Sequence, residues 1–287
     1  MRDRINEMAY LAAWRTVRLM PEGLADRLFR YGADRAVRKG GKSVDRLRSN
    51  LSRVVGSPAS DELVRDAMRS YARYWKEAFR LPSMSGEQQD AAFQMNGFDP
   101  VAEDSLRGRG SIIALPHMGN WDLAGAWAAR NGYGVTAAAE RLKPEGVFQR
   151  FLEYREQLGM TVVPTNGTSR PPLQILGDRL LEGDVIALVA DRDLSERGIK
   201  VDFFDGTASF PVGPAYLAVR HDRPLYTAEI HYEGPRAVCH ISGPVDTGTG
   251  PFRDRLDHTT QELARAFEKS IAAYPADWHM LQRFWVD

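Results

Sequence analysis

A histidine and an aspartate stand five positions apart in the stretch "SIIALPHMGNWD", which covers residues 111–122. His117 carries an imidazole that can accept a proton near neutral pH. Asp122 carries a carboxylate that can hold such an imidazole by one ring nitrogen and leave the other free, as in a general base that acts on a hydroxyl group. The pair therefore indicates acid–base chemistry, provided that the fold brings the two side chains together.

Contact between His117 and Asp122 requires a turn, because residues five apart on one straight α-helix point about 140° away from each other. The apolar run 111–115 predicts a strand that a proline ends, Gly119 permits tight backbone geometry, and Asn120 is suited to cap a following helix. We expect His117 at the carboxyl end of the strand, with Asp122 reaching back from the helix. The alternative is that Asp122 only complements the helix dipole and that His117 is an ordinary polar residue.

A second acidic pattern, "DRD" at residues 191–193, follows the apolar run "DVIALVA". Asp-x-Asp after a buried strand is typical of glycosyltransferases that hold a divalent metal ion on a sugar nucleotide, but such a site needs further oxygen ligands. The other histidines show no pair at metal-ligand spacing on one helix, and the single cysteine, Cys239, excludes an intrachain disulfide. We expect no bound metal and keep the metal-dependent glycosyltransferase as an alternative.

Strand-like and helical runs alternate from Ser111 onward, which predicts an α/β fold with a largely parallel or mixed central sheet flanked by helices. The expected strands cover residues 111–115, 134–139, 160–164, 184–190, 200–204, 224–232 and 236–243. The expected helices lie near 120–131, 145–157 and 172–182, and a last amphipathic helix carries Leu256, Leu263, Phe267 and Ile271. No long linker interrupts the chain, so we expect one domain over residues 1–287 with its catalytic α/β core at 105–285.

The first 82 residues read as a helical cap that is amphipathic and basic. Residues 2–53 hold thirteen Lys or Arg against six Asp or Glu, although the formal net charge of the whole chain is +0 and gives no reason to expect nucleic acid as a partner. Apolar residues between Ile5 and Tyr31 recur at helical spacing, with arginines between them. Such a segment can lie on an anionic membrane surface, or it can pack on the protein's own core. No segment approaches the ~20 apolar residues that span a bilayer.

The motif "HMGNWD" resembles the signature of histidine, four residues and an acid, usually HFGNWE, of the lipid A biosynthesis acyltransferase superfamily. That superfamily includes the actinobacterial phosphatidylinositol mannoside acyltransferases. "DRD", the segment "VDFFDGTASFPVGPAYLA" at 201–218 and the tail "YPADWHMLQRFW" resemble further family segments, so that the likeness extends over roughly residues 105–285. Arginine-rich helices in place of a transmembrane anchor, and the segment "LVADRDLSERGIKVDFF", favour the mannoside branch, although Asp191 stands where its members often carry glutamate.

The resemblance implies transfer of a fatty acyl chain, which we expect to be palmitoyl, from acyl-CoA to a mannose hydroxyl of phosphatidylinositol mannosides. It implies a peripheral, monotopic protein at the cytoplasmic face of the cell membrane, with acyl-CoA as a co-substrate and no further cofactor. His117 and Asp122 would then be catalytic, without an acyl-enzyme, and Asp191, Arg192, Glu140 and Arg155 would line the acceptor site. A lipid A-type lauroyl or myristoyl transferase acting on another glycolipid is the alternative within the family.

Overall fold

The computed structural model describes residues 14–140, 145–193 and 197–286, and it has the α/β architecture expected from the sequence. The strands are β1 (Phe93–Asn96), β2 (Ser111–Leu115), β3 (Val135–Ala139), β4 (Met160–Pro164), β5 (Val185–Val189), β6 (Ile199–Phe203), β7 (Gly206–Phe210), β8 (Leu225–Glu233) and β9 (Arg236–Ser242). The helices are α2 (Glu22–Lys39), α3 (Lys42–Val55), α4 (Asp61–Arg80), α5 (Gly86–Ala92), α6 (Asp99–Leu106), α7 (Trp121–Arg130), α8 (Glu145–Gln157), α9 (Pro172–Leu181), α10 (Gly213–His221) and α11 (Phe252–Ala273).

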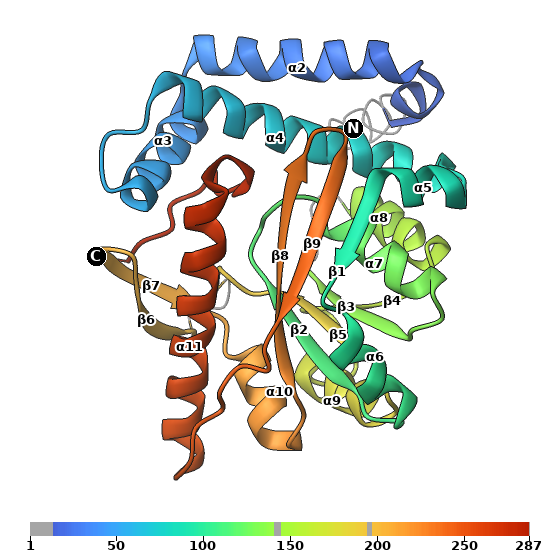
Figure 1. Ribbon diagram of the computed structural model, residues 1–287, viewed down its shortest axis with the longest axis vertical. Helices are drawn as coiled ribbons and strands as arrows, with labels where there is room; N and C mark the ends of the chain where they lie inside the picture. Colours follow the sequence, from blue (N-terminus) through green and yellow to red (C-terminus); the bar gives the residue numbers. More distant parts are fainter. Residues whose placement is uncertain (1–13, 141–144, 194–196, 287) are drawn as a thin grey trace.

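Seven strands form the central sheet in the order β1-β9-β8-β2-β5-β3-β4. Neighbouring strands run parallel, except that β8 and β9 form an antiparallel pair. The predicted mostly parallel sheet is therefore confirmed (Figure 1). The run "KVDFF" was expected to be a strand and is one, but it lies outside this sheet, in a two-stranded hairpin of β6 and β7.

Two apolar layers cover the faces of the sheet, and β2 at its centre contributes to both. Successive side chains of a strand point to opposite faces. Ile112 and Ala114 accordingly pack with residues of α9, α10 and α11. Ile113 and Leu115 pack with residues of α7 and α8 on the other face. All five residues of β2 are buried, as expected for a central strand covered on both sides.

Three helices, α2, α3 and α4, form a cap, and Figure 1 shows α4 lying across the end of the sheet at which β8 ends. Ser60 caps α4, since its side chain accepts a hydrogen bond from the backbone N–H of Leu63 at 3.1 Å. Among the described residues, no helix is long and apolar enough to cross a membrane. Ile5 and the other expected apolar positions of residues 1–13 lie outside the described residues.

The turn between β2 and α7 has the geometry that the sequence predicts. Gly119 has a φ of 59°, in the left-handed region, and a Cβ atom at this position would lie 2.5 Å from the backbone oxygen of Ile230. Asn120 caps α7 by accepting a hydrogen bond from the backbone N–H of Leu123 at 3.1 Å. Only glycine fits position 119, because a larger residue would meet both a strained φ and the backbone of β8.

We predict that Gly119→Ala destabilises the protein by more than Gly132→Ala. Gly132, just beyond the other end of α7, also has a positive φ, 88°, but nothing lies within 4 Å of its Cβ position. Both variants should lose about 1 kcal/mol from left-handed strain, and Gly119→Ala should lose a further ~2 kcal/mol or more from the clash. Urea unfolding measures the difference, and equal losses would contradict the close packing of this turn.

Candidate active site

His117 and Asp191 meet because β2 and β5 are parallel neighbours whose last residues, Leu115 and Val189, are partners in the strand register. Each functional residue follows two positions later. Nδ1 of His117 lies 2.5 Å from Oδ1 of Asp191, and the backbone N–H of His117 donates to Oδ2 at 2.9 Å. Among the described residues Nε2 of His117 has no hydrogen-bond partner, and 37% of this side chain is exposed. The imidazole is thus held on one side and open on the other.

The Asp191 side chain is fully buried beneath His117. The indole N–H of Trp278 donates to its Oδ2 at 2.9 Å. Burial alone would raise the pKa of this carboxyl, but the charge of His117 and the N–H donors of His117 and Trp278 lower it below its usual value. Asp191 is therefore an ionised carboxylate at neutral pH, and an ionised partner favours the Nδ1–H form of His117.

Asp122 has partners other than the one predicted from the sequence. Its Oδ1 accepts from Nε of Arg155 at 2.8 Å and its Oδ2 accepts from the hydroxyl of Tyr74 at 3.0 Å. Its first-turn position on α7 directs the side chain toward α8 and α4, whereas the end of β5 lies directly beside the end of β2. The prediction that Asp122 holds the imidazole is corrected: Asp191 does so.

The Asp122–Arg155 ion pair is nearly closed to solvent, with side-chain exposures of 2% and 16%. Burial would lower the pKa of Arg155, but the charge of Asp122 more than offsets this effect, so that the pKa is raised and the guanidinium stays charged. Burial and the same carboxylate raise the pKa of Tyr74 well above its usual value, which keeps its hydroxyl protonated and able to donate.

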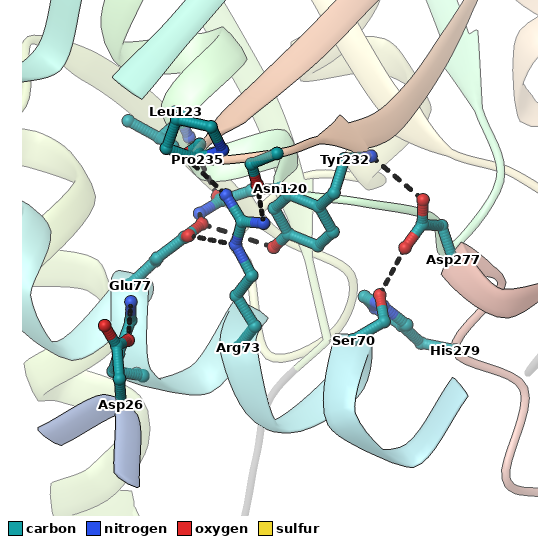
Figure 2. Close-up of polar contacts among 12 residues, drawn as sticks. Asp26, Ser70, Arg73, Glu77, Asn120, Leu123, Tyr232, Pro235, Asp277 and His279 are labelled. Carbon is teal, nitrogen blue, oxygen red and sulfur yellow. Dashed lines mark hydrogen bonds and ion pairs between the residues drawn. The ribbon is translucent and has the colours of Figure 1, made fainter. Parts of the chain in front are cut away.

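The cap helix α4 supports the turn that carries His117. Asn120 donates from Nδ2 to Glu77 at 2.8 Å, and the Tyr232 hydroxyl donates to the same carboxylate oxygen at 3.2 Å. Arg73 pairs with Glu77 and donates to the backbone oxygens of Gly234 and Pro235. Figure 2 shows these groups converging from α4, the turn and the β8–β9 connection. The start of α7 is thereby tied to the cap.

The C-terminal segment runs beside the same turn. The backbone N–H of His279 donates to the carbonyl of His117 at 2.7 Å, and that of Gly119 donates to the carbonyl of Asp277 at 3.1 Å. The hydroxyl of Ser70 on α4 donates to Oδ1 of Asp277 at 2.5 Å (Figure 2) and lies 3.0 Å from Nε2 of His279. Burial, together with the nearby charge of His117, lowers the pKa of His279 to about 3, so this second imidazole is neutral.

An apolar pocket begins next to the His117 turn and runs between α7 and the sheet. Leu115 and Val189, the last residues of β2 and β5, line it together with Trp121, whose ring lies edge-on to the His117 ring at 5.7 Å. Its sheet side includes Ile113, Val185, Ala187 and Ala228, and its helix side is made by the small residues Ala124, Gly125 and Ala128. Asp122 and Arg155 are its charged lining residues. The pocket has the composition of a site for an alkyl chain.

The remaining predicted residues, Arg192 and Glu140, do not belong to the two buried pairs. Arg192 is half-buried next to Asp191, and Glu140 is exposed just after β3. Asp193, the second acid of "DRD", accepts a hydrogen bond from the backbone N–H of Gly198. Among the described residues, no group of three His, Cys, Asp or Glu side chains could hold a metal ion. Cys239 is buried in β9 at the pocket, and burial raises the pKa of its thiol.

Sequence reasoning did not identify Tyr74 and Trp278, which contact the two buried carboxylates. Tyr74 lies on α4, 48 positions before its partner Asp122, and Trp278 lies 87 positions after Asp191. No local spacing connects such residues. The tail "YPADWHMLQRFW" was the available signal for Trp278, because it stood out as a motif without an assigned role.

Comparison with known proteins gives matches over nearly the whole chain. Residues 3–286 match the family described as bacterial lipid A biosynthesis acyltransferase. The phosphatidylinositol mannoside acyltransferase of Mycolicibacterium smegmatis is 43% identical over 286 residues, which cover 99% of this chain and 92% of the relative. The protein of that name from Mycobacterium tuberculosis is 41% identical and covers 98% of this chain and 88% of its own length. The chain therefore belongs to the bacterial lipid A biosynthesis acyltransferase family and is an acyltransferase.

Proposed function

We propose that the protein transfers a fatty acyl chain, palmitoyl in our expectation, from acyl-CoA to a mannose hydroxyl of a phosphatidylinositol mannoside. One observation carries the chemistry: an imidazole, held by a buried carboxylate, faces outward beside an apolar pocket at the carboxyl edge of the sheet. We infer the acceptor, a phosphatidylinositol mannoside, from the names of the relatives, which are 41–43% identical over almost the whole chain.

In this proposal the thioester lies next to His117, and the acyl chain points toward the apolar pocket under α7, whose cavity volume of about 70 Å³ can take only part of the chain. Nε2 of His117 takes the proton from the sugar hydroxyl while the hydroxyl oxygen attacks the thioester carbonyl. The tetrahedral intermediate then collapses, the carbon–sulfur bond breaks, and the imidazolium returns its proton to the leaving thiolate. No acyl-enzyme is needed, because the base activates the acceptor itself.

The two buried carboxylates have different roles in this mechanism. Asp191 keeps the Nδ1–H form of His117 and stabilises the imidazolium, although its full burial prevents the direct contact with the acceptor that we expected. Asp122 does not touch His117 in this mechanism. It forms an ion pair with Arg155 and thereby holds the guanidinium at the pocket. Arg192 and Glu140 remain our candidates for contacting the sugar, because neither is buried.

Two other activities would use the same site in different ways. A lipid A-type enzyme would transfer a lauroyl or myristoyl chain to another glycolipid with the same base. A metal-dependent glycosyltransferase would need the "DRD" carboxylates as ligands, but Asp191 already accepts hydrogen bonds from His117 and Trp278 and Asp193 accepts one from Gly198. That arrangement favours acyl transfer over the metal reaction.

We predict that His117→Ala lowers turnover by about 10²–10⁴-fold, the usual contribution of a positioned general base. Asp191→Asn should also be severely impaired, and the double variant should be scarcely worse than His117→Ala, because residues that act as one unit lose most of their effect at the first deletion. The assay incubates each protein with palmitoyl-CoA and a panel of glycolipids and identifies products by mass spectrometry.

His258→Ala is the matched control, because this histidine also pairs with an aspartate, Asp246, but lies on α11. It should retain parental turnover. A folded His117→Ala protein that acylates mannosides at the parental rate would end the catalytic interpretation. Transfer only to lipid A-type acceptors would establish the alternative within the family, and glycosyl transfer that requires added manganese would establish the metal-dependent reaction.

We predict that Asp122→Asn costs roughly 3 kcal/mol of folding stability, because it leaves the Arg155 guanidinium buried without its counter-charge. Adding Arg155→Met should recover much of that loss, since both charges are then gone. Thermal and urea unfolding measure the change. Turnover per folded molecule should fall less than in Asp191→Asn, because the His117–Asp191 contact remains. A loss of activity equal to that of His117→Ala, with unchanged stability, would instead show that Asp122 acts on the imidazole.

We also propose that the N-terminal helices bind the cytoplasmic face of the cell membrane. Leu24, Leu28 and Tyr31 of α2 are 54%, 49% and 57% exposed, although Ala25 and Ala33 of the same helix are buried. Arg27 and Arg30 are exposed beside them. Exposed leucines interleaved with arginines suit the headgroup region of an anionic bilayer, and the exposure speaks against complete burial of the stripe in the protein's core.

We predict that the protein sediments with phosphatidylinositol-containing vesicles and that charge reversal on the cap releases it. The changes to glutamate are at Arg15, Arg18, Arg27 and Arg30, and each should cost about 1 kcal/mol of binding. The control reverses four exposed basic residues elsewhere, at Arg107, Arg109, Lys200 and Arg220. Equal sedimentation of the two quadruple variants would show that the cap is not the binding surface.

A further inference from the structure

We propose that Trp278 is a positioning residue for His117, acting through the carboxylate of Asp191. The effect of Trp278 on catalysis rests on the proposed function, whereas its contact with Asp191 is independent of that function. Among the described residues, the Asp191 carboxylate accepts hydrogen bonds from two residues, His117 and Trp278. Because His117 is the group to be positioned, Trp278 is the contact that ties the carboxylate to another part of the chain.

The position of Trp278 follows from the pairing of two backbone segments. Residues 277–279 run antiparallel to residues 117–119, and Met118 and Trp278 form a bridge. Alternate side chains in an extended segment point to opposite sides. Asp277 and His279 therefore contact Ser70 on the cap side, while Trp278 points the other way, toward Asp191.

The indole cannot easily turn away from the carboxylate, because it is closely packed. Trp278 is fully buried, and the centroid of its ring lies 5.0 Å from the ring centroid of Phe284 and 6.1 Å from that of Trp285. Aromatic packing of this kind fixes the plane of the ring and hence the direction of its single N–H. The donor at Oδ2 therefore sets the rotation of the carboxylate.

The rotation of the Asp191 carboxylate determines which of its oxygens contacts the His117 ring. With Oδ2 occupied by Trp278 and by the His117 backbone N–H, Oδ1 faces Nδ1 of the imidazole at 2.5 Å. A carboxylate held in this way keeps the proton on Nδ1 and leaves Nε2 as the base. The indole also serves as a donor to an ionised group, and such hydrogen bonds are stronger than those between neutral groups.

The test compares Trp278→Phe with Trp285→Phe. Trp285 belongs to the same aromatic cluster and is also buried, but its N–H donates to the backbone oxygen of Phe203 at 3.3 Å and not to the dyad. Trp278→Phe should lower kcat about tenfold with little change in KM for palmitoyl-CoA, the size expected when a hydrogen bond to a charged group is lost. Trp285→Phe should leave kcat unchanged. Incorporation of 3-benzothienylalanine at position 278, which keeps the ring shape and replaces N–H by sulfur, gives the same comparison if the phenylalanine variant does not fold.

Two further measurements separate positioning from packing. In an Asp191→Asn background, Trp278→Phe should cause no further loss of kcat, because the carboxylate through which Trp278 acts on His117 is already absent. The low-field proton NMR signal of the His117 Nδ1–H should move in Trp278→Phe and stay in place in Trp285→Phe, whether or not the acceptor has been identified. An additive kcat loss or an unmoved proton signal would overturn the proposal, whereas a moved signal in a protein without acyl transfer would leave the positioning intact and refute the proposed function.

Discussion

The parallel pairing of β2 with β5 is the constraint on which the site depends. Their matched ends place His117 and Asp191 side by side although 74 positions separate them in the chain. Sheet hydrogen bonds on both flanks of β2 and burial on both faces leave this strand little freedom. The geometry of the dyad is therefore set by a strand that is hydrogen-bonded on both flanks and covered on both faces, as the proposed acid–base role requires.

Much of this arrangement can be predicted from local sequence patterns. The apolar run 111–115 and the proline after it predict a strand end, and Gly119 with Asn120 predicts a tight turn into a helix. Because parallel strands place their carboxyl ends at one edge, the residues that follow two such runs, His117 and Asp191, are expected to be neighbours. These inferences hold because each depends on backbone geometry that a few neighbouring residues determine.

The choice of partner for each side chain could not be predicted in this way. Asp122 is close to His117 in sequence, but its direction depends on where α8 and α4 bring Arg155 and Tyr74. The pocket likewise depends on small residues of α7 that face the sheet, and Trp278 reaches the dyad from the far end of the chain. Such contacts arise from tertiary packing and leave no spacing in the sequence.

The two buried carboxylates have different basic partners. Asp122 pairs with an arginine, whose guanidinium stays charged, and Asp191 pairs with an imidazole that can gain and lose a proton. Were Asp122 the partner of His117, Arg155 would be left in a nearly closed site without its counter-charge, at a cost of several kcal/mol. In the proposed mechanism His117 takes up and releases a proton, and the buried Asp122–Arg155 ion pair holds its two opposite charges beside the pocket throughout.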